Sequence, residues 1–87
     1  SRSTFESLKI DLSIHYKNNG KKNIAEDIID EKALAVWAFV HGLVGILKKT
    51  QALGPENIDG GPLLLMQNLS KDLDKYIERS VNAILAI

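Results

Sequence analysis

The longest apolar stretch of the chain, residues 33–47, constrains the fold more than any other feature. It holds no Asp, Glu, Lys or Arg, and its large apolar side chains recur at steps of three and four residues. This spacing predicts a helix over residues 23–50 that is buried on more than one side. Asn23 and Glu26 have the spacing of a helix cap, and Asp30 is a candidate start of a second segment. A helix of this kind needs other helices as neighbours.

The size of the chain predicts one domain, residues 1–87, with a marginal core. Since the chain has no cysteine, neither a disulfide nor a thiolate metal site can stabilise it, and burial against a second copy becomes the expected solution. We therefore expect a homodimer. The 11 basic and 11 acidic residues cancel, so the chain itself is not expected to bind nucleic acid.

The length of the same apolar stretch indicates whether the chain could cross a membrane. About 15 residues fall short of the roughly 20 needed to cross a bilayer, and the first residues lack the pattern of a signal peptide. The sequence therefore predicts no membrane contact and a cytoplasmic location.

The first element, residues 4–17, is ambiguous. Its apolar residues alternate as on a strand, yet Phe5, Leu8 and Tyr16 also share one face of a helix. Ser3 and Glu6 have capping-box spacing, and a strand would find no second strand to pair with. A helix is therefore favoured.

Glycine, asparagine and proline mark two breaks, at residues 17–23 and 54–62. Gly20 is placed to take the left-handed conformation after the first helix, and Pro62 is placed to begin a third helix over residues 62–87. The chain is therefore predicted to be all-α, with three antiparallel helices.

Small residues on the second helix predict how two copies meet. Ala38, Gly42 and Gly45 form a stripe that lets another helix approach closely, and glycine inside a helix costs about 0.5 to 1 kcal/mol relative to alanine. A two-fold interface built from the second and third helices would be a four-helix bundle. Its candidate residues are Ala38, Gly42, Gly45, Met66, Leu69, Leu73 and Ile77.

Candidate chemical sites are few. His41 lies beside Trp37 on the apolar helix, where it could contact a ligand or be a buried histidine with a protein partner. His15 is the only other histidine, and neither has the spacing of a metal site. No catalytic arrangement is present, so we expect no enzyme, no metal and no cofactor.

The segment at residues 33–43 carries a family resemblance. It resembles the Trp-x-x-x-His-Gly segment in the C-terminal regulatory domains of one subgroup of TetR-family transcriptional regulators, bacterial proteins in which an N-terminal helix-turn-helix domain binds DNA. The resemblance implies that this chain is the dimerising, effector-binding part, that the DNA-binding domain is missing, and that the last two helices form the dimer's bundle. A small, largely apolar effector would then contact Phe5, Leu8, Tyr16, Trp37 and His41, which are candidates by placement. The alternative is a stand-alone helical interaction module that binds no ligand.

Overall fold

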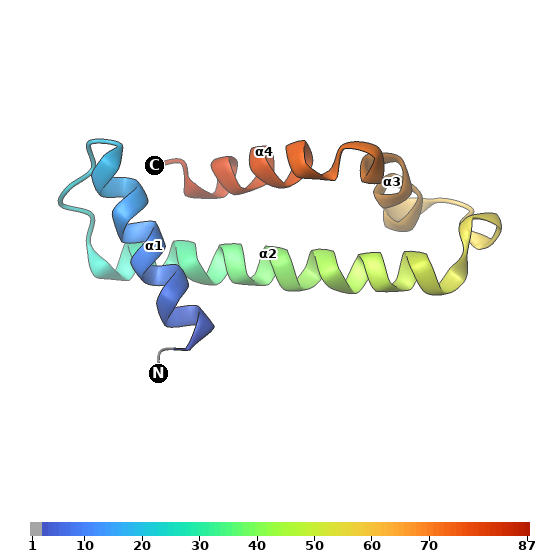
Figure 1. Cartoon of the computed structure of the whole chain (residues 1–87), viewed down its shortest axis with the longest axis horizontal. Helices are drawn as coiled ribbons and strands as arrows, with labels where there is room; N and C mark the ends of the chain where they lie inside the picture. The colour runs from blue at the N-terminus through green and yellow to red at the C-terminus, as the bar shows by residue number, and fades with distance from the viewer. Residues whose placement is uncertain (1–2) are drawn as a thin grey trace. The chain divides into compact units, whose positions relative to one another are not determined.

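The computed structural model describes residues 3–87 and is all-α, as the sequence predicts (Figure 1). No strand occurs within these residues. Over residues 3–87, four α-helices and two short 3-10 helices follow one another: α1 (Thr4–Asn18), α2 (Glu26–Leu53), η1 (Pro55–Asn57), α3 (Gly61–Leu69), η2 (Ser70–Asp72) and α4 (Leu73–Leu85).

The chain divides into two compact units, Ser1–Ala38 and Phe39–Ile87, and the boundary falls inside α2. The first unit contains α1 and the first half of α2, whereas the second contains the rest of α2 with α3 and α4. The two units share one continuous helix, α2. The predicted break at Asp30 is wrong, because α2 continues through this residue.

The start of α1 follows from its cap. The Ser3 hydroxyl oxygen accepts the backbone N–H of Glu6 at 3.1 Å, which satisfies one of the free donors at the helix start. Leu12 and Tyr16, four residues apart, are buried on the same side of the helix. The helical interpretation of the ambiguous first element is therefore confirmed.

The end of α1 is a Schellman arrangement. The Lys21 N–H donates to the Tyr16 carbonyl at 2.8 Å, and the Gly20 N–H donates to the Lys17 carbonyl at 3.2 Å. Gly20 has a φ of 81°, a conformation that side chains with a Cβ rarely adopt. The predicted role of Gly20 is confirmed.

The limits of α2 differ from the prediction by three residues at each end. The helix begins at Glu26, so Asn23 is not its cap; the first carbonyl to accept is that of Ala25, from the N–H groups of Ile28 and Ile29. At the other end the helix continues to Leu53, since residues 51–53 are good helix formers. It stops where Gly54, with a φ of 79°, precedes a proline.

The predicted third helix is interrupted. It begins at Gly61, one residue before Pro62, and breaks into α3, η2 and α4 around residues 70–72. The Ser70 hydroxyl donates to the Gln67 carbonyl at 2.7 Å, and Asp72 leaves the helical region with φ −144° and ψ 53°. Short polar side chains such as these compete for backbone partners and weaken a continuous helix.

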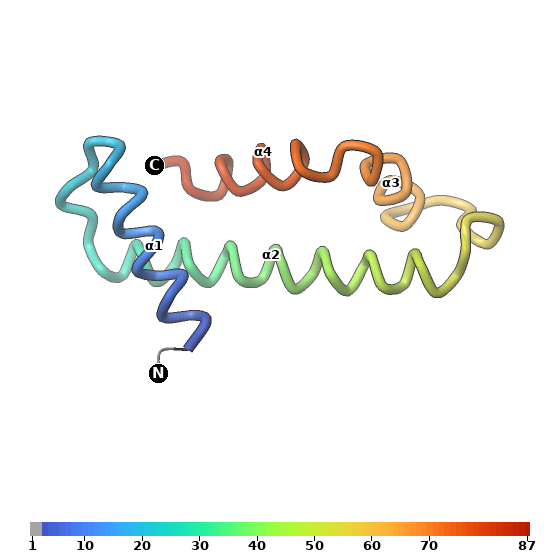
Figure 2. The backbone as a smooth tube through the Cα atoms, in the orientation of Figure 1, coloured from blue at the N-terminus to red at the C-terminus, as the bar shows by residue number. Residues whose placement is uncertain are grey.

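Within the second unit, the chain reverses after α2 and then runs back in the opposite direction through α3 and α4 (Figure 2). The rings of Phe39 and Tyr76 lie 5.9 Å apart and join α2 to α4. Leu43 and Met66 are buried in this unit. One side of α2 is therefore occupied by packing within the chain.

Candidate functional site

The aromatic side chains predicted to contact a ligand in the first unit lie between α1 and α2. Phe5 and Trp37 meet edge to face, with ring centroids 5.5 Å apart and planes at 75°. Leu8 is half-buried, and Tyr16 is only 3% exposed. Burial raises the pKa of the Tyr16 hydroxyl above its ordinary value of 10.0, because the charged phenolate is poorly solvated there.

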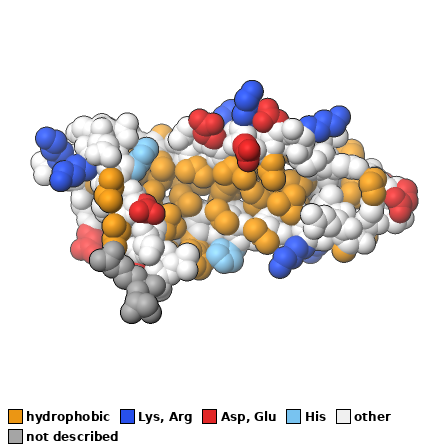
Figure 3. All heavy atoms as spheres, in the orientation of Figure 1, with side chains coloured by type: hydrophobic (Ala, Val, Ile, Leu, Met, Phe, Trp, Pro, Cys, Tyr) orange, Lys and Arg blue, Asp and Glu red, His pale blue; other side chains and the backbone are white. Residues whose placement is uncertain are grey.

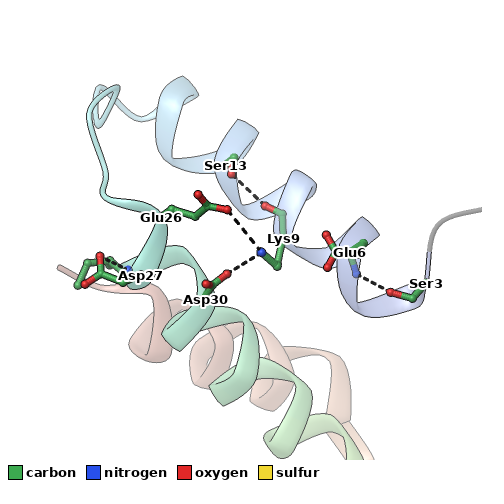
Figure 4. Close-up of polar contacts among 8 residues, drawn as sticks. Ser3, Glu6, Lys9, Ser13, Glu26, Asp27 and Asp30 are labelled. Carbon is green, nitrogen blue, oxygen red and sulfur yellow. Dashed lines mark hydrogen bonds and ion pairs between the residues drawn. The ribbon is translucent and has the colours of Figure 1, made fainter.

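A charged contact that sequence reasoning missed joins the same two helices. The Lys9 ammonium lies 2.7 Å from the Asp30 carboxylate and 3.8 Å from that of Glu26 (Figure 4). The hydrogen bond to Asp30 raises the pKa of Lys9 above its ordinary 10.5. A hollow of about 280 Å³ adjoins this contact, and it is lined by Glu6, Lys9, Ile10, Ser13, Ile24, Glu26 and Ile29. Nothing in the sequence signals this pairing, because it depends on how α1 crosses α2.

The second unit carries an apolar surface on the side of α2 that α4 does not cover. Val40 is 41% exposed and Val44 is 43% exposed, and the two valines lie about one helical turn apart. Figure 3 shows hydrophobic side chains gathered over α2 and α4 on the face turned to the viewer. We call the exposed side of residues 38–48 the α2 face.

A shallow hollow of about 310 Å³ lies on the α2 face. It is lined by Val40, His41, Val44, Gly45 and Lys48. A Cβ atom added at Gly42 or at Gly45 would meet nothing within 4 Å, so no neighbour in the described chain requires glycine at either position. His41 is exposed here, which contradicts the interpretation of this residue as a buried histidine.

The predicted interface residues divide by burial. Ala38, Gly42 and Gly45 are exposed along α2, whereas Leu69, Leu73 and Ile77 are half-buried. Met66 is 5% exposed and already contributes to the interior of the second unit. The small residues of α2 are thus exposed to solvent, whereas the candidate residues of α3 and α4 are at least partly buried.

A third hollow, of about 270 Å³, lies where the end of α2 meets α3. No sequence pattern predicted it, because its walls combine residues of α2, of the turn that follows and of α3. Its lining combines apolar and amide side chains: Leu47, Thr50, Gln51, Gly54, Pro55, Ile58, Met66, Gln67 and Ser70.

Among residues 3–87, no three histidine, aspartate or glutamate side chains gather in a way that could hold a metal ion. By length and composition alone α2 could cross a membrane, since an 18-residue window has a mean hydropathy of 1.3 and only 17% of it is buried. Core helices of soluble proteins can have the same length and composition, but they are mostly buried.

Comparison of the chain with family models, with curated proteins and with solved structures found no match.

Proposed function

We propose that the chain is a homodimeric helical module, the dimerising and effector-binding part of a TetR-like transcriptional regulator whose DNA-binding domain lies in another segment. The single observation that carries the dimer is the exposed side of α2, where a Cβ added at Gly42 or Gly45 would meet no neighbour and where a hollow adjoins Gly45. Exposed apolar surface of this kind marks an interaction site, and the low expected stability of a small domain favours a second copy as the occupant.

The glycines support close helix packing. Glycine within a helix is about 0.8 to 1 kcal/mol less stable than alanine, and no contact inside the described chain offsets this loss at Gly42 or Gly45. Packing against a helix of another subunit would offset it, because a missing Cβ lets the two backbones approach and lets a valine from the partner enter the hollow. The same face on both copies is what a two-fold dimer requires.

A membrane is the second candidate for covering α2, on the strength of its hydropathy and its low burial. Length favours the protein partner. The charge-free segment, residues 33–47, is about 15 residues long and spans roughly 22 Å as a helix, whereas the hydrocarbon core of a bilayer is about 30 Å thick. Asp30, Glu31 and Lys32 on one side and Lys48 and Lys49 on the other border this segment.

The regulator part of the proposal rests on the resemblance of residues 33–43 and on the aromatic pair. Phe5 and Trp37 form an apolar surface of two rings in the first unit, which suits a small, largely apolar effector. An effector that binds one of two dimer arrangements better than the other would shift their populations and so control DNA-binding domains attached to the module.

Sedimentation velocity tests the dimer. The purified chain is expected to sediment with twice its mass of 9.6 kDa, and Gly42→Leu is expected to sediment as a monomer. Ser7→Leu adds the same side chain at an exposed position on α1 and is expected to leave the dimer unchanged. A Gly42→Leu variant that stays dimeric would refute the proposed interface. A wild-type chain that is soluble only with detergent or lipid vesicles would favour the membrane instead.

The reading frame upstream of the Ser1 codon tests the regulator. A helix-turn-helix domain encoded there supports the proposal. A start codon directly before Ser1 would remove DNA binding and leave the stand-alone dimeric module.

A further inference from the structure

The hollow between α2 and α3 lies entirely within the second unit and is separate from the α2 face and from the aromatic pair of the first unit. Its lining includes Gly54, Pro55 and Ile58 of the turn that follows α2 (Figure 1). The turn is held in place: Gly54 adopts a φ of 79°, and the Asn57 side-chain amide donates to the Leu53 carbonyl at 2.7 Å. The walls therefore belong to an ordered part of the unit with defined hydrogen bonds.

Part of the lining of this hollow is apolar. Leu47 and Ile58 are half-buried, and Met66 is buried with 5% of its surface exposed. A surface of this composition favours a ring or a short hydrocarbon chain, since burying apolar area is the main favourable term in binding small molecules.

The rim of the hollow carries polar groups of two kinds. The Thr50 hydroxyl donates to the Ile46 carbonyl at 2.8 Å and the Ser70 hydroxyl donates to the Gln67 carbonyl at 2.7 Å, so both hydroxyl protons are used within the chain. The side-chain amides of Gln51 and Gln67 make no hydrogen bond to any residue that the structure describes. Each of these amides can donate through its NH₂ group and accept through its oxygen.

Among the described residues, those that line the hollow carry no charge. A carboxylate or an ammonium group would lose its hydration there without gaining an opposite charge, which disfavours ionic ligands. A neutral carboxamide or lactam, by contrast, has one donor and one acceptor side by side and matches a primary amide in a paired hydrogen bond.

We propose that the hollow between α2 and α3 is a binding site for a small neutral molecule that joins an apolar ring to a carboxamide or lactam group. The ring lies against Leu47, Ile58 and Met66, and the amide pairs with Gln67 and Gln51. The volume of about 270 Å³ is close to the lower end of the range for ligand sites, so the ligand is of the size of a single substituted ring. This site does not depend on the dimer or on the regulator proposed above.

Benzamide is a suitable probe, with ethylbenzene and benzoate as matched compounds that lack the amide or carry a charge. Titration into the ¹⁵N-labelled full chain, followed by NMR, is expected to shift the side-chain amide signals of Gln51 and Gln67 and the backbone signals of residues around the hollow. Benzamide is expected to bind about tenfold more tightly than either matched compound, the factor for roughly one hydrogen bond.

Two variants test whether the side-chain amide of Gln67 contributes to the binding of benzamide. Gln67→Leu keeps the approximate size of the side chain but removes its amide, and we expect about tenfold weaker binding of benzamide with little change for ethylbenzene. Asn68→Leu changes an exposed neighbouring side chain that does not line the hollow, and its affinity for benzamide is expected to be unchanged.

Circular dichroism confirms that each variant is folded, and Gln51→Leu, at an exposed position, provides a second test if Gln67→Leu does not fold. Equal affinities for benzamide and ethylbenzene, shifts spread over the whole chain, or no saturable binding at millimolar benzamide would each overturn the proposal.

Discussion

Replacing Gly42 and Gly45 together by alanine distinguishes a free α2 face from a dimer interface. A free face predicts a more stable chain, whereas an interface predicts a weaker dimer. In the described chain each new methyl group meets nothing within 4 Å. If the face is free, each change stabilises the chain by about 0.8 to 1 kcal/mol through helix propensity alone. The double variant would then gain roughly 2 kcal/mol, which for a chain of this size raises the melting temperature by about 6 to 16 °C.

In a close-packed dimer the same methyl groups lie between two helices. Overpacking costs typically about 1 to 3 kcal/mol at each site, and the two-fold axis repeats both changes, so four methyl groups enter the interface. Even the lower limit, about 4 kcal/mol per dimer, raises the dissociation constant roughly 10³-fold. We expect the dimer of the double variant to lose affinity by about this factor.

The assay combines sedimentation velocity over a range of concentrations with thermal melting at two concentrations. The dimer predicts that the double variant dissociates at concentrations where the wild type does not, and that the melting temperature of the wild type rises with concentration. Ser7→Ala is the matched control, since it improves helix propensity at an exposed position of α1. A double variant that melts higher and keeps the wild-type dissociation constant would refute the argument.

Three further predictions concern the first unit. Phe5→Leu removes the edge-to-face contact with Trp37, so we expect a loss of about 0.5 to 1.5 kcal/mol in denaturant unfolding and a change in Trp37 fluorescence; an unchanged spectrum would contradict the contact. Because the pKa of Tyr16 is raised on folding, its contribution to stability is complete below pH 10.0 and is lost as the pH rises above that value, and Tyr16→Phe should flatten the alkaline part of the stability curve. The pKa of Lys9 is raised by its hydrogen bond to Asp30, so the stability gained from this pair is present below pH 10.5 and is lost at higher pH; Lys9→Met should lower the melting temperature at low ionic strength and have little effect at high salt.

Local signals in the sequence predicted the all-α class and several helix ends. Ser3 with Glu6, and Gly20 after the first helix, act through contacts within a few residues, which a sequence displays directly. The ambiguous first element was resolved by a different argument, the lack of any second strand for it to pair with. That argument succeeded because it used the whole chain rather than the local pattern.

The ends of α2 and the break before α4 could not be predicted in the same way. Asn23 has a suitable spacing to Glu26, yet the helix begins after it, because cap spacing shows only that a start is possible. Ser70 and Asp72 occur inside a pattern that reads as one amphipathic helix. Whether such residues stay helical depends on how the two segments pack on α2, and the periodicity carries no information on that.

Sequence reasoning found part of the candidate site. Phe5 and Trp37 were singled out separately, and the structure places them in contact. The pairing of Lys9 with Asp30 and the hollow between α2 and α3 were missed, because both depend on tertiary contacts between residues that carry no pattern of their own. The effector and the dimer stay predictions.

The α2 face offers part of what the proposed two-fold interface would use. Val40, Val44 and Gly45 line one hollow, whereas Gly42, two residues from each valine, lies on the other side of the helix. When two copies of a face meet across a dyad, every contact of residue i with residue j occurs twice. In the proposed dimer, a valine that enters the hollow beside Gly45 would be matched by its symmetry mate, so one helix would supply both parts of the contact. Such packing would favour glycine at a helical position where nothing in the described chain requires it.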